Sequence, residues 1–302
     1  MVRNLKKRRA KEAATGYLFL TPAVFVIGIF VILPIFYAIF LSFHKVKLLG
    51  GISYRFIGLD HFTRMLHDER VWIALWNTFQ YVIIVVPIQT ALALILAAAL
   101  NSKISGKNLF RVLFFLPTVT SSAVLTLIFM WMYNNEGIIN DVLAFLHLPT
   151  YNWLGDPAVA LKAIMAMNIW STAPYFMVIY LAALQDIPDT LYEAAEIDGA
   201  NWWHKFRYIT IPQLRPVTSF VVIMGIIGTF QLFDQSYIFS AGSGGPNNST
   251  LTMVLLIYQY AFKNLDMGYA AALALTLALV IMGATLIERS LQREEKIEER
   301  GR

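Results

Sequence analysis

The run YLFLTPAVFVIGIFVILPIFYAIFLSF, from Tyr17 to Phe43, contains no charged residue. A hydrocarbon core about 30 Å thick requires about 20 apolar residues in a helix that crosses it. The run is also far longer than the apolar region of about 7–15 residues in a secretory signal peptide. Although basic residues from Arg3 to Lys11 precede it, the run therefore predicts a retained membrane-spanning helix.

Long apolar runs recur along the whole chain. Of its 302 residues, 58% are hydrophobic and 14% are charged, against about 45–50% and about 25% in globular proteins. We predict an all-α, polytopic membrane protein with six transmembrane helices at 17–43, 73–100, 112–133, 159–184, 216–240 and 268–287. Helices are expected because lipid offers the backbone no partners and the runs lack the alternation of a β-barrel. Only Lys162 and Asp234 bring charge into these spans.

Lysine and arginine are distributed unevenly between the segments that join these spans. With a cytoplasmic N-terminus, the inner segments carry 17 of the 24 basic residues and the outer segments carry seven. Cytoplasmic segments are enriched in these residues, so we place both termini in the cytoplasm. Residues 1–16 form a basic tail, 17–287 a transmembrane domain and 288–302 a charged tail. Five outer basic residues, all in 44–72, lie on the disfavoured side.

The segment from Thr250 to Phe262 is apolar but short. As a seventh span it would place the basic C-terminal tail outside, which the charge distribution disfavours. We therefore predict an interfacial or half-buried helix on the outer side.

The segment from Ile187 to Pro216, IPDTLYEAAEIDGANWWHKFRYITIPQLRP, joins the fourth and fifth spans on the cytoplasmic side. We predict two short helices that meet at Gly199, because glycine adopts the left-handed conformation that ends many helices. The second helix would run from Asn201 to Ile209, and Pro212 and Pro216 would end it before span five.

A helix pair that projects from a membrane bundle can dock into a groove of a soluble partner and pass its motion to the adjoining spans. Thr190 and Glu193 also have the spacing of a capping box, in which Glu193 would only cap its own helix. The residues alone leave docking and capping open.

The residues from Glu193 to Pro216 follow the pattern E-A-A-x-x-D-G-A-x-x-x-x-x-F-x-x-I-x-I-P-x-x-x-P. This pattern resembles the EAA signature of ABC importer permease subunits, with Ile211 in place of the leucine before the first proline. Other stretches of the chain resemble the carbohydrate-uptake branch of this family, which includes the maltose and glycerol-phosphate permeases. These stretches are Tyr17–Phe43, Gly58–Thr78, Leu113–Met132, Gly244–Pro246 and Gly268–Ala271. The chain departs from the maltose subunit in having no large outer domain.

The resemblance implies the membrane-spanning permease subunit of an ATP-driven, binding-protein-dependent sugar importer, located in a prokaryotic cytoplasmic (inner) membrane. Its helix pair would insert into a separate ATPase, with Glu193 as the acidic contact and Gly199 as the tight corner. The implied coupling residues are Glu193, Ala194, Ala195, Asp198, Gly199 and Ala200. The implied partners are a second permease subunit in a heterodimer, a dimer of ATP-binding subunits, an extracytoplasmic solute-binding protein and membrane lipid. ATP and Mg would bind to the partner ATPase, and no cofactor to this chain.

Residues suited to a sugar gather in spans four and five, namely Asn168, Thr172, Tyr175, Phe230, Gln231 and Asp234. Transporter sites lie near the membrane midplane, where polar groups of facing helices meet. The residues alone leave other roles open. Asn168 and Thr172 could instead form hydrogen bonds to neighbouring helices, and Asp234 could instead lie in water at the outer surface. The stretches Asn168–Tyr175 and Phe230–Asp234 resemble the segments that line the sugar site in maltose-type permeases. Asp234 occupies the position where those permeases have asparagine, which leaves the identity of the cargo open.

Other chemistries find little support in the sequence. The absence of cysteine excludes disulfides and thiolate metal sites, and the histidines lack zinc spacing. Gly242–Gly245 lacks the remainder of a phosphate-binding loop motif. Taken together, these features predict no bound metal and no enzymatic activity. We also predict no bound nucleic acid. An ion-gradient-driven secondary transporter would need buried charged relays, and only Asp234 is available. A polytopic membrane enzyme would need a polar cluster at one membrane face, and we find none.

Overall fold

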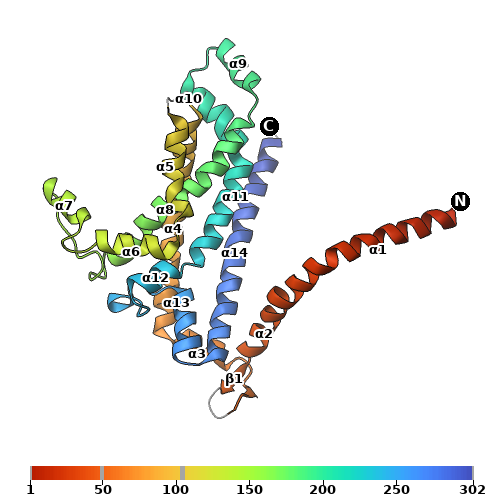
Figure 1. The fold of residues 1–302 in the computed structure, drawn as a ribbon, viewed down its shortest axis with the longest axis vertical. Coiled ribbons are helices and arrows are strands. Elements are labelled where there is room, and N and C mark those ends of the chain that lie inside the picture. The colour runs from red at the N-terminus through yellow and green to blue at the C-terminus, as the bar shows by residue number, and fades with distance from the viewer. Residues whose placement is uncertain (1, 48–50, 103–105, 301–302) are drawn as a thin grey trace. The chain divides into compact units, whose positions relative to one another are not determined.

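The computed structural model describes residues 2–47, 51–102 and 106–300 (Figure 1). They divide into two compact units, the first made of Met1–Met65 and Tyr260–Leu275, and the second of Leu66–Gln259 and Thr276–Arg302. Within the described residues, five helices are long and apolar enough to cross a membrane, and a bent helix pair brings the count to six if it forms one span. The predicted six-span, largely helical fold is thus confirmed.

The first unit begins with one continuous helix. Its three sections are α1 (Val2–Ile27), the π-helical turn η1 (Gly28–Ile32) and α2 (Leu33–Ser42). In the wide turn, the backbone N–H of Leu33 donates to the carbonyl of Gly28, one residue farther back than in an α-helix. Pro34 follows at once, and the wider turn lets the helix continue across a residue that has no N–H of its own.

A small β-hairpin follows the first helix, in the segment 44–72, which was predicted to be an outer loop without strands. Strand β1 (His44–Lys47) pairs antiparallel with β2 (Ser53–Phe56), so that His44 faces Phe56 and Lys47 faces Ser53. The hairpin leads into α3 (Asp60–His67). In the same unit, the glycine of the Gly268–Ala271 stretch lies directly against His44 and His61.

Arg64 joins α3 to the beginning of α14 (Met267–Arg300). Its guanidinium carbon lies 3.9 Å from the ring centre of Tyr269, and its Nη1 lies 2.7 Å from Asp266 Oδ2. The carboxylate and the aromatic face neutralise and cover this cation. One of the five basic residues of the predicted outer segment 44–72 is therefore paired within the protein.

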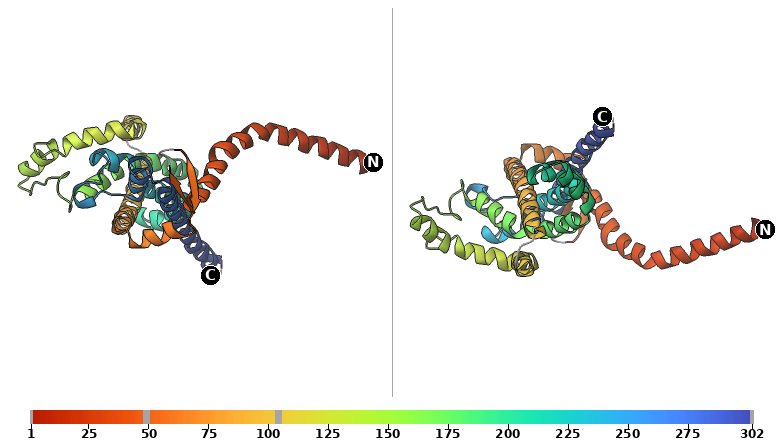
Figure 2. Two further views of the ribbon diagram at one scale, coloured as in Figure 1. Left: turned by 90° about the horizontal axis from the view of Figure 1, so that it is seen from below. Right: turned by 90° about the horizontal axis from the view of Figure 1, so that it is seen from above.

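The core of the second unit lies between α4 (Glu69–Asn101), α8 (Ala160–Gln185) and α11 (Ile211–Phe230). These helices run side by side and stay grouped when seen from either end (Figure 2). Ala93 and Ala97 of α4 and Ala173 of α8 are fully buried in this core. Small side chains let membrane helices approach closely, so alanine at these positions fits the tight packing.

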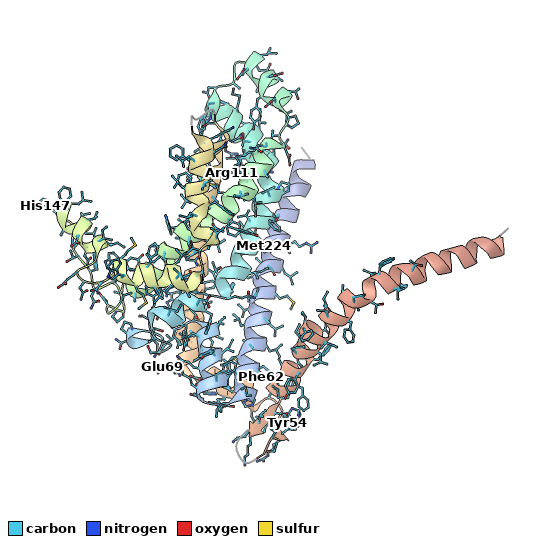
Figure 3. The ribbon with its side chains drawn as sticks, in the orientation of Figure 1. Tyr54, Phe62, Glu69, Arg111, His147 and Met224 are labelled. Carbon is cyan, nitrogen blue, oxygen red and sulfur yellow. The ribbon has the colours of Figure 1, made fainter. Side chains whose placement is uncertain are left out.

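The predicted third span, 112–133, is not one helix. It forms α5 (Lys107–Val119) and α6 (Ser122–Met132), whose axes are bent by 98°. Pro117 cannot donate to the helix ladder, and the run from Thr118 to Ser122 offers hydroxyl groups that compete for backbone partners. After α6, the short helix α7 (Ile138–Phe145) leads to His147 (Figure 3).

The prediction that Pro212 and Pro216 end the helix before span five is wrong. Helix α10 (Trp202–Lys205), the π-helical turn η2 (Phe206–Thr210) and α11 run on without interruption past Pro212 and Pro216. The N–H of Ile211 donates to the carbonyl of Phe206, so a wide turn again precedes a proline and absorbs its missing donor. The prolines therefore do not separate α10 from span five.

The two ends of the second unit can be followed through labelled side chains. Glu69, at the start of α4, and Arg111, near the start of α5, lie toward opposite ends of the bundle (Figure 3).

The remaining elements are α9 (Asp189–Ile197), α12 (Asp234–Phe239), η3 (Pro246–Asn248), α13 (Met253–Tyr258) and η4 (Gln259–Lys263).

The apolar segment predicted to be interfacial or half-buried is buried within the protein. Met253, Leu255 and Leu256 of α13 have 0% exposure, and the helix packs against α4. Polar side chains satisfy the backbone before it, since Asn77 Nδ2 donates to the carbonyls of Asn248 at 2.8 Å and Leu251 at 3.0 Å. These bonds let non-helical backbone lie inside a membrane protein.

Replacing Gly268 by alanine is expected to destabilise the protein. The added Cβ would lie 2.2 Å from the carbonyl oxygen of His44 and 2.5 Å from His61 Nε2. Overpacking of this kind costs about 1–3 kcal/mol. Thermal unfolding of the purified protein in detergent should show Gly268→Ala unfolding at a lower temperature than the wild type.

Gly283→Ala is the matched control, because Gly283 lies in the same helix and no atom lies within 4 Å of its added Cβ. Alanine in a helix is favoured over glycine by about 0.5–1 kcal/mol, so this variant should be as stable as the wild type or slightly more stable. Equal stability of the two variants would contradict the close contact at Gly268.

Candidate functional site

The predicted corner at Gly199 is formed as expected. Gly199 has a φ of 78°, and the N–H of Ala200 donates to the carbonyl of Ala195 at 2.8 Å while that of Gly199 donates to Glu196 at 3.0 Å. This is the hydrogen-bond pattern of a glycine-terminated helix. Asn201 then caps α10, since its side chain accepts from the N–H of His204. We call α9, Gly199 and α10 the coupling corner.

Glu193 does not cap α9. The residue that precedes the helix is Pro188, which makes no side-chain capping bond, and Thr190 lies inside the helix. Glu193 is exposed, and its carboxylate makes no hydrogen bond or ion pair with any described residue. The capping-box alternative is therefore wrong, and the carboxylate is available to another molecule.

The other predicted coupling residues surround this carboxylate on a projecting element. Helix α9 buries no residue and lies beyond the ends of the bundle helices (Figure 1). Ala194, Asp198 and Gly199 are exposed, whereas Ala195 and Ala200 are half-buried. The structure thus brings all six predicted residues together at one end of the second unit.

Two side-chain bonds connect the halves of the coupling corner. Lys205 Nζ lies 2.5 Å from Glu196 Oε1, and the hydroxyls of Tyr192 and Thr210 lie 2.9 Å apart. The hydrogen bond from Lys205 and its positive charge hold the pKa of Glu196 below its ordinary value. The two bonds cross-link α9 to the helix that continues into α11.

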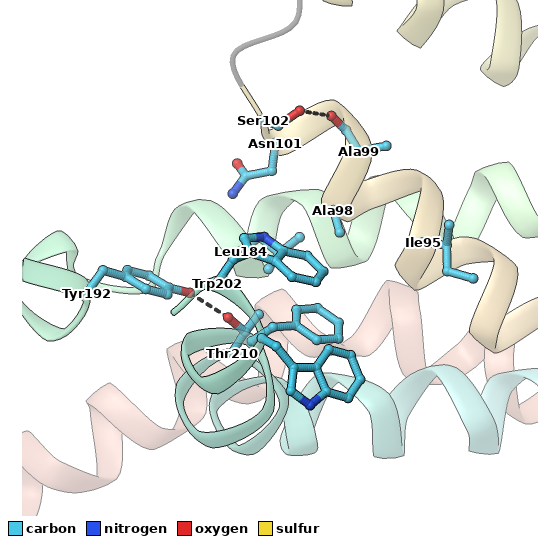
Figure 4. Close-up of a pocket in the computed structure, with 11 residues that line it drawn as sticks. Ile95, Ala98, Ala99, Asn101, Ser102, Leu184, Tyr192, Trp202 and Thr210 are labelled. Carbon is cyan, nitrogen blue, oxygen red and sulfur yellow. Dashed lines mark hydrogen bonds between the residues drawn. The ribbon is translucent and has the colours of Figure 1, made fainter. Parts of the chain in front are cut away.

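A pocket of about 630 Å³ lies between the coupling corner and the end of α4 (Figure 4). Its walls include Trp202, Trp203 and Phe206, and the rings of Trp202 and Phe206 stack with centres 5.4 Å apart. Aromatic residues therefore fill part of this space without closing it. The corner rests on the bundle through a few rings rather than through a dense core.

A second pocket lies where α5, α6, α8 and α12 meet, and has a volume of about 260 Å³. We call it the polar pocket. Its polar lining residues are Thr118, Thr120, Ser122, Ser171, Thr172, Tyr175 and Gln235. Hydroxyl and amide groups are the partners that a hydroxyl-rich cargo requires, since each donates and accepts hydrogen bonds.

The span-four residues of the predicted cargo site divide between two roles. Tyr175 lines the polar pocket and is 47% exposed. Thr172 also lines it, but its hydroxyl lies 2.7 Å from Gln89 Oε1 on α4 and 2.7 Å from the carbonyl of Asn168. Asn168 is only 8% exposed and does not line the pocket. Thr172 therefore bonds two helices as well as facing the cavity.

The span-five residues lie at a break between helices. Phe230 ends α11 and is 3% exposed, Gln231 is exposed in the turn that follows, and Asp234 is exposed at the start of α12. None of the three lines the polar pocket. Their neighbour Gln235 does, and its Nε2 donates to Ser122 Oγ at 3.0 Å.

Sequence reasoning missed Gln235 and the hydroxyl groups of the broken third span. The signal was the run Thr118–Ser122, whose threonines and serines stand in the middle of an apolar segment directly after Pro117. Interrupted hydrophobic segments often mark transporter binding sites. Within the described residues, no three His, Cys, Asp or Glu side chains are grouped to hold a metal ion.

Residues 89–296, which include the coupling corner and all the lining residues of the polar pocket, match the family described as binding-protein-dependent transport system inner membrane component. The chain belongs to this family. Members are permease subunits of ABC transporters rather than enzymes, and the matched region covers well over half of the sequence.

Relatives of this permease align along almost its entire length. The lactose transport system permease protein LacF of Rhizobium radiobacter is 38% identical over 93% of this chain and 95% of its own. The arabinooligosaccharides transport system permease protein AraP of Bacillus subtilis (strain 168) is 35% identical over 93% of this chain and 89% of its own. A bacterial alginate ABC transporter, solved in complex with an alginate pentasaccharide-bound periplasmic protein, shares the fold with a TM-score of 0.82. It is 21% identical and covers 95% of this chain and 96% of its own.

Replacing Thr172 by valine is expected to destabilise this permease by about 1 kcal/mol, in the range of interhelical hydrogen bonds within membranes. The change keeps the shape of the side chain but leaves the buried Gln89, which is 1% exposed, without the hydroxyl that donates to it. Thr172→Ser keeps the donor and should be closer in stability to the wild type. Unfolding in detergent measures both, and a valine variant more stable than the serine variant would contradict the proposed bond.

Proposed function

We propose that this permease forms the translocation path of an ATP-driven importer of sugars and takes its driving motion from a separate ATPase through the coupling corner. The observation that carries the proposal is the free carboxylate of Glu193 on a projecting helix that buries none of its own residues. An exposed helix of this kind suits insertion into a partner's groove.

The proposed assembly contains a second permease subunit, a dimer of ATP-binding subunits and an extracytoplasmic solute-binding protein. The family description includes dependence on a binding protein, and the solved alginate transporter was captured with its periplasmic protein. ATP and Mg would be held by the ATPase. The coupling corner and both termini would face the cytoplasm, as the distribution of basic residues requires.

The proposed cargo path includes the polar pocket and the predicted residues Asn168, Thr172, Tyr175, Phe230, Gln231 and Asp234. Sugar transport is supported by relatives that carry lactose and arabinooligosaccharides. Tyr175 and Thr172 would contact cargo directly from α8. Asp234 and Gln231 flank the pocket at the break after α11, where exposed polar groups can receive cargo from outside.

An ion-gradient mechanism is less well supported by the structure. Such transporters use buried carboxylates or basic groups as relays. Throughout the part of the chain that the structure describes, no Asp, Glu, Lys or Arg side chain is buried. The energy source is therefore better sought in the ATPase partner.

Replacing Glu193 by glutamine should weaken assembly with the ATPase. A hydrogen bond to a charged group contributes about 1.5–3 kcal/mol, which corresponds to a loss of binding of about ten-fold or more. Co-purification of the ATPase with the permease pair, and sugar uptake by proteoliposomes that contain the full transporter, measure the effect.

Glu196→Gln is the matched control, because Glu196 lies on the same helix but is already paired with Lys205. Its loss should weaken ATPase binding much less than the loss of Glu193. Equal effects of the two variants, or normal uptake by Glu193→Gln, would contradict an acidic docking contact at Glu193.

Replacing Asp234 by alanine should lower sugar uptake and leave assembly with the ATPase and the second permease normal. The carboxylate is exposed at the break before α12, and loss of a charge-assisted hydrogen bond to cargo would reduce transport efficiency about ten-fold. Uptake at several sugar concentrations measures this loss. Transport equal to the wild type would remove Asp234 from the cargo path.

A further inference from the structure

A buried amide lies near the middle of α4. Gln89 is 1% exposed and belongs to a helix that is apolar enough to cross a membrane. Polar side chains are costly at this depth and are kept where they bond to a neighbouring helix or serve transport. Gln89 does not line the polar pocket. Its role therefore lies in the helices that it contacts, which are α8 on one side and α11 on the other.

On the α8 side, Gln89 holds the hydroxyl of Thr172, a residue that lines the polar pocket. Thr172 Oγ1 lies 2.7 Å from Gln89 Oε1 and 2.7 Å from the carbonyl oxygen of Asn168. A hydroxyl has one hydrogen to donate, and both of these oxygens are acceptors. A shift of the Gln89 amide therefore changes which acceptor the Thr172 hydroxyl bonds.

On the α11 side, the same amide rests on bare backbone. A Cβ added at the buried Gly225 would lie 2.7 Å from Gln89 Nε2. Glycine inside a helix is less favourable than alanine, but it lets a neighbouring group approach the backbone closely. Gly228, three residues farther along α11, has no atom within 4 Å of its added Cβ. The close contact with the amide is therefore particular to Gly225.

Helix α11 connects this contact to the coupling corner. The chain is helical without a break from Trp202 to Phe230, and Gly225 lies within that stretch. Conformational changes in proteins include small sliding movements of packed helices. Because Gln89 Nε2 has little free space toward Gly225, a displacement of α11 relative to α4 either pushes the amide or releases it.

We infer that Gln89 is a positioning residue that passes the movement of α11 to the Thr172 hydroxyl in the wall of the polar pocket. In this structure the amide is seated on Gly225 and accepts from Thr172. When α11 moves, the amide shifts and Thr172 turns to its other acceptor, the carbonyl of Asn168. This inference rests on the proposed function, because it names a residue through which the coupling corner acts on the same cargo path.

The test measures how the α8 wall of the polar pocket responds to nucleotide. The chain has no cysteine, so Ser171→Cys gives this chain a single thiol beside Thr172, at a position that is 9% exposed and lines the pocket. We call this variant the reporter. It is assembled in proteoliposomes with the second permease, the ATPase and the binding protein, and every further change is made in it.

A small methanethiosulfonate reagent is applied without nucleotide and with a non-hydrolysable ATP analogue. The labelling of this chain is followed by its mass, so that thiols on the partners do not contribute. The response is the ratio of the two labelling rates, and its measurement requires no identified cargo.

Gln89→Met keeps the length of the side chain and replaces a strong acceptor by a weak one. It is expected to lower the response at least three-fold while co-purification with the ATPase stays normal. Gly225→Ala should lower the response to a similar extent, because the added Cβ displaces the amide. Gly228→Ala is the matched control and should respond as the reporter does.

The double variant Gln89→Ala with Gly225→Ala distinguishes a relay from simple packing. Removal of the amide relieves the overpacking that Gly225→Ala creates, so most of the thermal stability lost in that variant should return. The response should stay low, because no amide then connects α11 to Thr172. A purely structural role would restore the response together with the stability.

Several results would overturn the inference. They are a response in Gln89→Met equal to that of the reporter, a response that returns in the double variant, and an equal loss in Gly228→Ala, which would make the effect one of any added bulk in α11. Loss of the ATPase from the Gln89→Met complex would assign Gln89 to assembly instead. A reporter that shows no response to nucleotide would contradict the ATP-driven function as well, so the two failures are distinguishable.

Discussion

Hydrocarbon gives a backbone N–H or C=O group nothing to bond to, so every helix break inside the membrane needs protein or water beside it. The second unit meets this constraint in two ways. Around α13, side chains supply the bonds: Asn77 donates to two carbonyls, and Thr78 accepts from the N–H of Met253. Thr252 donates to the carbonyl of Leu232. At the bend between α5 and α6, Thr120 donates to the carbonyls of Leu116 and Pro117, and the bend also borders two pockets. Side chains close the first break, and we propose the second as part of the cargo path.

Much of the architecture could be predicted, because it depends on local or one-dimensional properties of the chain. Apolar length located the second and fourth spans to within a few residues, whereas the third proved to be a bent helix pair and the helix of the fifth begins as early as Trp202. Gly199 and Asn201 located the coupling corner, since a left-handed glycine and an amide cap act on their own neighbours. The prolines were harder to interpret. Whether a proline ends a helix depends on the turn before it, and the π-helical turns η1 and η2 absorbed Pro34 and Pro212.

The candidate cargo site could be predicted only in part, because its walls come from four helices. Helical spacing placed Tyr175 and Thr172 on one face, and both line the polar pocket. Spacing could not show that Asn168 is turned away or that Gln235, rather than its neighbour Asp234, reaches the cavity. The bend of 98° brings Ser122 to that point, and a bend of this kind depends on packing between helices far apart in sequence.

The same continuity that contradicted the proline prediction connects the two proposed sites mechanically. From Trp202 to Phe230 the chain is helical without a break, so a displacement of the coupling corner is carried along α11 as a rigid element. The cross-links Lys205–Glu196 and Tyr192–Thr210 make α9 move with it. At its far end, α11 reaches the turn before α12, whose Gln235 bonds to Ser122 at the bend of the third span. We propose that a partner that displaces the corner acts through α11 on the wall of the polar pocket, at the hydrogen bond between Gln235 and Ser122.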